Sequence, residues 1–214
     1  QRAVINGFKN KAAELTRLLL SSVAPLEIVN NEIIPALNTV GKGFEETEAI
    51  APVDLLRRAD IPVLTVGIDE KVIEGSHKLS VVADITLGEM DLTQMDMLVL
   101  PGGLGGVASI MASEPAMDAV RFAWENGKFL GAICAGPTIL ASLGILDGKN
   151  ATCYPGCEDQ MGSANMLPDR TFVWDGNVIT GTSAGCALPF GLALIEALKG
   201  EAEMQRIYDQ IVIR

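Results

Sequence analysis

The sequence predicts one doubly wound α/β domain, a sandwich of three layers with a mainly parallel central sheet. Short apolar runs alternate with amphipathic stretches of roughly ten to fifteen residues from about residue 33 onward. Glycine closes several of these stretches, as it closes many helices. With 214 residues and a hydrophobic share of 49%, the chain can bury the core that such a domain requires.

Each apolar run is predicted as a strand and each amphipathic stretch as a helix. The run at 33–40 is a weak strand, because Pro35 cannot donate to a ladder. The predicted strands are 33–40, 62–68, 79–84, 97–100, 129–133, 150–154, 172–174 and 178–182. The predicted helices are 44–58, 114–126, 137–143 and 187–199, followed by a helix or tail at 201–214. Ligands of such sheets bind beyond the carboxyl ends of the strands.

The first residues have a different pattern. Residues 1–24 predict an amphipathic helix with Phe8, Leu15 and Leu19 among its apolar positions. We therefore expect an N-terminal helical extension at 1–32, which packs on the domain or on a partner chain, and an α/β domain at 33–214.

Composition excludes several classes of partner. The formal net charge of −11 repels phosphate backbones and anionic lipids, so neither nucleic acid nor a membrane surface is expected. No apolar run approaches the ~20 residues of a membrane span. Four cysteines are too few for a disulfide scaffold and favour a reduced, cytoplasmic setting. The chain starts at Gln1, and removal of a targeting peptide would place it in an organelle instead.

Cys134 is the sharpest candidate for chemistry. A predicted strand runs directly into it, and small residues with a proline begin a helix just after it. This is the pattern of a nucleophile elbow, in which Ala132 and Gly136 leave room for the turn. The start of the helix favours thiolate, which predicts a thiol pKa below ~8.5. The alternative is a buried structural cysteine, which the strand-end position and the small neighbours disfavour.

Two glycines, Gly102 and Gly103, end another predicted strand. Their backbone amides are candidates for an oxyanion hole near Cys134, although glycine at a strand end is weak evidence by itself.

Three carboxylates open the helix predicted at 44–58. Glu45 and Glu46 are expected to be solvated partners of the helix dipole. Glu48 lies one turn further on and is expected to point inward. There it would donate a hydrogen bond to a Cys134 thiolate or shuttle a proton.

A second elbow-like pattern, at 181–185, is rejected as a serine nucleophile. The serine hydrolases with this pattern need a histidine after the serine, Ser183, and the single histidine of the chain, His77, precedes it. We expect Ser183 to line the pocket. His77 is expected to serve a surface or an interface rather than catalysis.

The motifs described above occupy four segments in order along the chain: 43–48, 101–103, 134–137 and 182–183. With this combination the chain resembles the ThiJ/PfpI superfamily, in the branch of the human Parkinson disease protein and its bacterial relatives. The resemblance covers about residues 36–214. It implies a flavodoxin-like sandwich that is usually dimeric, with the site near the dimer interface. It also implies site residues: Cys134 as an oxidation-prone nucleophile, Glu48 as its carboxyl partner, and Gly102 and Gly103 as oxyanion amides.

The chain departs from the family at several positions. Ala135 stands where the protease-like branch has histidine, so peptidase activity is not expected. Tyr154 replaces a histidine of the human-like branch, and the segment at 183–186 lacks an anion-binding arginine. We expect the substrate to be bound by these positions, namely Ala135, Tyr154, Ser183 and Cys186.

The remaining cysteines suggest no metal centre. Cys153 and Cys157 form a C-x-x-x-C pair, whereas zinc needs about four ligands, so no metal is expected. Cys186 is predicted to act as a resolving thiol for oxidised Cys134.

The family implies two main functions. One is a cofactor-free glyoxalase or deglycase, a lyase or hydrolase acting through Cys134 on small dicarbonyls such as methylglyoxal or on damaged proteins. The other is a redox-sensing chaperone that uses Cys134 oxidation without turnover. A protein–protein module descended from an enzyme is a third. In each case a homodimer is expected, and the enzymatic reaction needs no cofactor.

Overall fold

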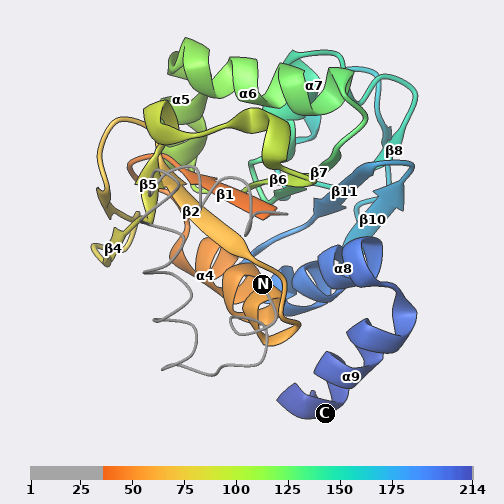
Figure 1. Cartoon of the computed structure of the whole chain (residues 1–214). Coiled ribbons are helices and arrows are strands. Elements are labelled where there is room, and N and C mark those ends of the chain that lie inside the picture. Colours follow the sequence, from red (N-terminus) through yellow and green to blue (C-terminus); the bar gives the residue numbers. More distant parts are fainter. Residues whose placement is uncertain (1–35, 214) are drawn as a thin grey trace, which may run out of the picture.

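A seven-stranded sheet runs through the centre of the computed structural model, which describes residues 36–213 (Figure 1). All neighbouring strands are parallel except the pair β10 and β11 at one edge. From that edge to the other the strands are β10 (Phe172–Asp175), β11 (Val178–Gly181), β7 (Phe129–Ile133), β6 (Met97–Leu100), β1 (Ala36–Val40), β2 (Val63–Gly67) and β5 (Ile85–Thr86).

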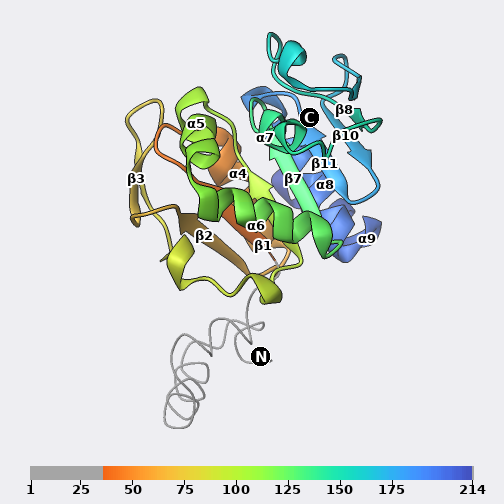
Figure 2. The same cartoon turned by 90° about the horizontal axis from the view of Figure 1, so that it is seen from above.

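Helices cover both faces of the sheet, as Figures 1 and 2 show. One face carries α5 (Leu104–Ala112), α6 (Glu114–Glu125) and α7 (Pro137–Ser142). The other carries α4 (Glu46–Arg58) and α8 (Ala187–Lys199), and α9 (Glu201–Ile211) packs against α8. The predicted three-layer, flavodoxin-like sandwich is therefore confirmed.

The sheet separates the two larger of three apolar core clusters. Phe190 of α8 and Leu55 of α4 are buried on one side, and Leu100 of β6 and Val120 of α6 are buried on the other. Complete burial of a side chain such as Phe190 contributes about 2–3 kcal/mol. Every residue of β6 is buried, as expected for a parallel strand covered on both faces.

The direction of strand order reverses at β1, which pairs with β2 on one side and β6 on the other. A crevice forms at such a reversal, outside the carboxyl ends of the strands. Because β7 pairs with β6, the segments that come after β1, β6 and β7 meet at this crevice. The fold thus brings the three predicted motifs, each located after one of these strands, to one place.

The predicted strands 97–100 and 129–133 and the predicted helix 187–199 match the structure residue for residue. Helix α4 begins later than predicted, because Glu45 is its N-cap and accepts a hydrogen bond from the Glu48 amide at 2.7 Å.

Two strand predictions are wrong in extent. The strand predicted at 79–84 is shorter, β4 (Ser80–Val82), and it pairs with β3 (Val72–Glu74) in a separate hairpin rather than in the central sheet. The stretch at 150–154 is reduced to β8 (Asn150–Ala151), which pairs with β9 (Asn165–Met166). Short 3-10 helices fill several loops: η1 (Leu87–Glu89), η2 (Leu92–Gln94), η3 (Glu158–Gln160) and η4 (Ala184–Cys186).

Helix α5 was not predicted, because it opens with the poor helix formers Gly105 and Gly106. A Cβ on Gly106 would lie 2.8 Å from the Phe44 Cα. This turn of α5 can approach the loop after β1 because Gly106 has no side chain.

The predicted extension at 1–32 lies outside the described residues, and the domain boundary there stays a prediction. Between residues 36 and 213, no helix is both long and apolar enough to cross a membrane.

Candidate active site

Cys134 occupies a strained turn between β7 and α7. Its φ of +64° lies in the left-handed region, which costs a non-glycine residue about 1–2 kcal/mol. Two backbone hydrogen bonds hold the turn: the Cys134 amide donates to the Gly181 carbonyl at 2.9 Å, and the Tyr154 amide donates to the Cys134 carbonyl at 2.8 Å. A Cβ on Gly136 would lie 2.6 Å from the Leu100 carbonyl oxygen. The predicted elbow geometry is confirmed.

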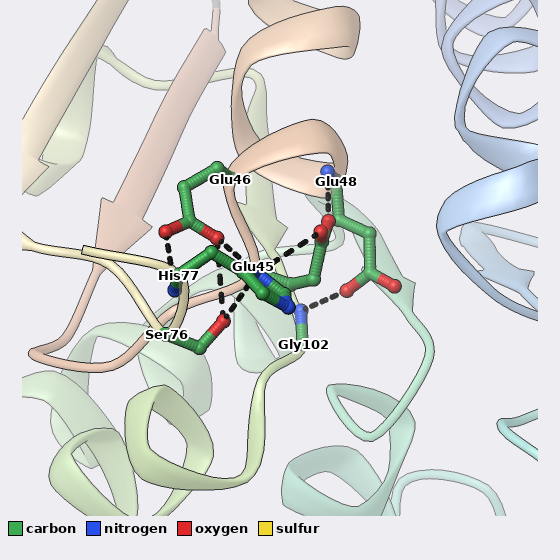
Figure 3. A network of polar contacts seen from close by, with 6 residues as sticks. All are labelled: Glu45, Glu46, Glu48, Ser76, His77 and Gly102. Carbon is green, nitrogen blue, oxygen red and sulfur yellow. Dashed lines mark hydrogen bonds and ion pairs between the residues drawn. The ribbon is translucent and has the colours of Figure 1, made fainter. Parts of the chain in front are cut away.

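Glu48 lies beside this cysteine in the first turn of α4 and is fully buried. Its Oε2 accepts a hydrogen bond from the Gly102 amide at 3.0 Å, as Figure 3 shows. The carboxyl group also lies against the Cys134 thiol, and each group alters the ionisation of the other. Within residues 36–213, Oε1 has no hydrogen-bond partner. The inward orientation predicted for Glu48 is therefore correct.

Burial dominates the ionisation of both groups. It raises the pKa of Glu48 to about 7, against the lowering effect of hydrogen bonds with Cys134 and the Gly102 amide. Burial also raises the pKa of Cys134 to about 12, and the negative charge of Glu48 acts in the same direction. The prediction that the helix start lowers the thiol pKa is wrong, because the side chain is buried and the amides of Ala135 and Gly103 offset this only in part.

Part of what raises the Cys134 pKa is the ionised carboxylate of Glu48 itself. Once Glu48 takes up a proton, its negative charge is lost and the carboxyl group becomes a hydrogen-bond donor beside the thiol. The thiolate is therefore favoured when Glu48 is protonated. We expect the two groups to share one proton and one negative charge and to titrate as a pair.

The predicted oxyanion hole needs a correction at Gly102. Its amide is engaged by Glu48 and is not available to an oxyanion. The amides that reach the Cys134 sulfur are those of Gly103 and Ala135. Gly102 has another role: a Cβ there would lie 2.5 Å from Glu48 Oε2 and 2.7 Å from the Cys134 Cβ, so only glycine lets the two side chains meet.

A cavity of about 790 Å³ opens over the cysteine. Most of the predicted site residues line it: Cys134, Glu48, Gly103, Ala135, Tyr154 and Ser183. Cys186 does not, and its sulfur instead accepts a hydrogen bond from the Ser183 hydroxyl at 3.8 Å. Its predicted role in substrate binding is therefore not supported, and a Cys134–Cys186 linkage stays a prediction. Cys157, which was not assigned to the site, also lines the cavity.

Glu46 was assigned wrongly, whereas the surface position expected for His77 agrees with the structure. Glu46 is buried rather than solvated, its Oε1 accepts from the His77 amide at 2.7 Å, and its Oε2 lies 2.8 Å from His77 Nδ1 (Figure 3). Burial opposes its ionisation, but these contacts outweigh burial and lower the Glu46 pKa to about 2. The same contacts raise the pKa of His77, which is largely exposed as expected yet also lines the cavity. A Cβ on Gly75 would lie 2.3 Å from Glu46 Oε1, so the glycine before Ser76 was the available sequence signal.

Glu45, Glu46 and His77 also form the one set of metal-ligating side chains found between residues 36 and 213. Within this set, Glu46 Oε1 accepts a hydrogen bond from the His77 amide, and Glu46 Oε2 lies 2.8 Å from His77 Nδ1. Glu46 and His77 are therefore arranged as an ion pair.

Comparison with known proteins identifies the family to which this architecture belongs. The sequence profile of the DJ-1/PfpI family matches residues 36–197. The chain belongs to the DJ-1/PfpI family. This confirms the resemblance inferred from the cysteine elbow and the motifs around it. The profile of the B12 binding domain matches residues 1–56, of which the described part forms β1 and most of α4 of the same sandwich.

Curated members of the DJ-1/PfpI family include close relatives. Protein dj-1beta of Drosophila melanogaster is 34% identical over 180 residues, which are 83% of this chain and 96% of that protein. Deglycase PfpI of Pyrococcus furiosus is 34% identical over 157 residues, which are 73% of this chain and 94% of that protein. Protein DJ-1 homolog B of Arabidopsis thaliana is 36% identical over 75% of this chain, which spans only 37% of that longer protein.

Solved structures of DJ-1/PfpI proteins share the fold. Drosophila melanogaster DJ-1beta superposes with a TM-score of 0.81 at 34% identity, over 85% of this chain and 99% of that chain. Oxidized Toxoplasma gondii DJ-1 superposes with a TM-score of 0.79 at 28% identity, over 84% and 98% of the two chains.

Proposed function

We propose that this DJ-1/PfpI protein is a cysteine-dependent, cofactor-free enzyme of glyoxalase or deglycase type that acts on small dicarbonyls such as methylglyoxal or on their adducts. The observation that supports this best is the contact between Cys134 and a fully buried Glu48 at the cavity. It couples a nucleophile to a group that holds or releases a proton near neutral pH. The relative from Pyrococcus furiosus carries the name deglycase.

The proposed reaction needs no external oxidant. The Cys134 sulfur bonds to the aldehyde carbon of methylglyoxal, and the carbonyl oxygen takes the Glu48 proton to give a hemithioacetal. Glu48 then removes the proton from this carbon and returns one to the neighbouring carbon, while the hydroxyl proton passes from the first oxygen to the second, so the first carbon is oxidised and the second reduced. Water cleaves the resulting thioester to lactate and restores the thiol. The amides of Gly103 and Ala135 would stabilise the oxyanions.

This function predicts that the protein converts methylglyoxal to lactate in the presence of EDTA and without glutathione. A proton that Glu48 carries between the carbons can exchange with water before it is returned. In deuterium oxide, the lactate should therefore carry deuterium at carbon 2 in part of the product. Mass spectrometry and enzymatic lactate assay measure both quantities, and protein denatured by heat is the control. Absence of lactate above that control would contradict the proposed enzyme.

The second candidate is a redox sensor or chaperone without turnover. A peroxide would oxidise Cys134 to the sulfenic acid and then to the sulfinic acid, and Glu48 would hold the oxidised form by a hydrogen bond. The relative from Toxoplasma gondii was solved in an oxidized form, which favours this reading of the family. Client binding that depends on the sulfinate would support it.

We also propose a homodimer. Val72, Leu79 and Val82 in and beside the β3–β4 hairpin are more than half exposed, as expected of apolar side chains that a second copy covers. All four cysteines are free, which supports a cytoplasmic setting. We further propose that residues 1–32 form an extension that precedes an α/β domain at 33–214.

A further inference from the structure

The cavity above Cys134 has an unbalanced charge. Among the described residues that line it, the acidic and basic side chains are Glu45, Glu48 and His77, and neither lysine nor arginine is among them. The segment at 183–186, part of which lines the cavity, carries no charged residue.

The positive charge of His77 is already compensated. Glu46 lies behind the histidine, 2.8 Å from Nδ1, and also accepts its backbone amide. Glu46 is held ionised by these contacts, so the two residues form a neutral pair. His77 therefore does not offer the cavity a free cation.

Glu45 is the carboxylate that remains. Its Oε2 caps α4 through the Glu48 amide at 2.7 Å, and its Oε1 lies 4.0 Å from His77 Nδ1. Its side chain is 16% exposed, at the edge of the cavity. Together with the single negative charge shared by Cys134 and Glu48, it makes the approach to the sulfur electronegative.

We propose that the cavity selects its electrophiles by charge: uncharged and cationic carbonyl compounds reach Cys134, and compounds that carry a carboxylate are excluded, with Glu45 setting the preference. This rests on the proposed function and deepens it, because it names the charge class of the substrate. Methylglyoxal, or its adduct on a guanidinium group, belongs to the admitted class. An oxo acid such as glyoxylate belongs to the excluded class. A charge of one sign at a cavity with low-dielectric walls acts strongly on an approaching ion.

The test uses two reagents of similar size and the same leaving group, iodoacetamide, which is uncharged, and iodoacetate, which is an anion. Mass spectrometry of the peptide that contains Cys134 gives the rate of its alkylation separately from the other thiols. The ratio of the two rates is divided by the ratio for 2-mercaptoethanol under the same conditions. We expect Cys134 to prefer iodoacetamide by roughly three- to tenfold more than the small thiol does.

Three variants assign the effect. Glu45→Gln retains an oxygen to cap α4 but removes the charge, and should lower the preference by most of that factor. Glu45→Asp retains the charge and should preserve it. Glu125→Gln removes the same charge from an exposed position at the end of α6, near the amino end of β7 and away from Cys134, and should leave the ratio unchanged.

A ratio for the parent protein equal to that of 2-mercaptoethanol would overturn the inference. Equal ratios in Glu45→Gln and Glu125→Gln would overturn the assignment to Glu45. These alkylations need no turnover, so the inference can fail while methylglyoxal is converted to lactate, and it can hold when no lactate forms.

Discussion

Replacement of Cys134 by serine is expected to reduce methylglyoxal turnover by roughly a thousandfold or more. A serine hydroxyl is far less acidic than a thiol, so Glu48 cannot take its proton to give an anionic nucleophile near neutral pH. The fold should persist, because the change is nearly isosteric and the backbone hydrogen bonds of the turn do not involve the side chain. Lactate formation measured at saturating methylglyoxal gives the size of the loss.

The matched control is Cys153→Ser, the same chemical change at a buried cysteine that does not line the cavity. It should retain turnover, and melting temperatures of both variants show whether the fold is intact. Turnover that survives in Cys134→Ser would rule out the cysteine mechanism. If the parent protein has no turnover, and if Cys134→Ser loses the sulfinate-dependent client binding of the parent, the redox function is favoured instead.

Gly102→Ala is expected to reduce turnover by roughly a hundredfold, the scale of loss caused by displacement of reacting groups by about 1 Å. The added Cβ would lie 2.5 Å from Glu48 Oε2, 2.7 Å from the Cys134 Cβ and 3.0 Å from the Ala135 nitrogen, so the carboxyl group and the elbow must move apart. The hydrogen bond from the Gly102 amide to Glu48 would be distorted by the same movement. Turnover and the alkylation rate of Cys134, measured on the same preparation, should change together.

Gly88→Ala is the control for this substitution, because a Cβ at Gly88 meets no atom within 4 Å. It should have the turnover and melting temperature of the parent. Unchanged turnover in Gly102→Ala would show that the close approach of Glu48 and Cys134 is not required, and would contradict the role given to this glycine.

The elbow could be predicted from the sequence because its signals are local. The apolar run at 129–133 must end where Cys134 begins, and Gly136 and Pro137 restrict the backbone of the next turn to the start of a helix. The position of Glu48 was predictable for a similar reason: it lies three residues after the N-cap, Glu45, on the side of α4 that can face the sheet.

The pair of Glu46 and His77 could not be predicted in this way. The two residues are 31 positions apart, and they meet because the turn of the β3–β4 hairpin lies over the start of α4. Acidic residues in the first turn of a helix are most often solvated, and neither residue type nor spacing separates Glu46 from Glu45.

The Gly102 amide shows another limit of the sequence. Two glycines at a strand end indicate that the backbone approaches something closely, but the direction of each N–H depends on the loop conformation. In the structure the first amide binds Glu48, and the second is near Cys134. The ionisation of Cys134 also depends on burial, which a local pattern does not report.

The pH profile of Cys134 alkylation by iodoacetamide shows whether Cys134 and Glu48 share one proton. Glu48 titrates with a pKa of about 7 and Cys134, beside an ionised Glu48, with a pKa of about 12. Because part of the singly ionised pair is thiolate, the rate should rise through about pH 7 and level off well before the second ionisation. Glu48→Gln should abolish the step near pH 7 and leave one ionisation, that of the thiol, with its pKa below 12 because the carboxylate charge is gone. A single step near the ordinary thiol pKa of about 8.5 in the parent, or superimposable profiles of the two proteins, would contradict the shared proton.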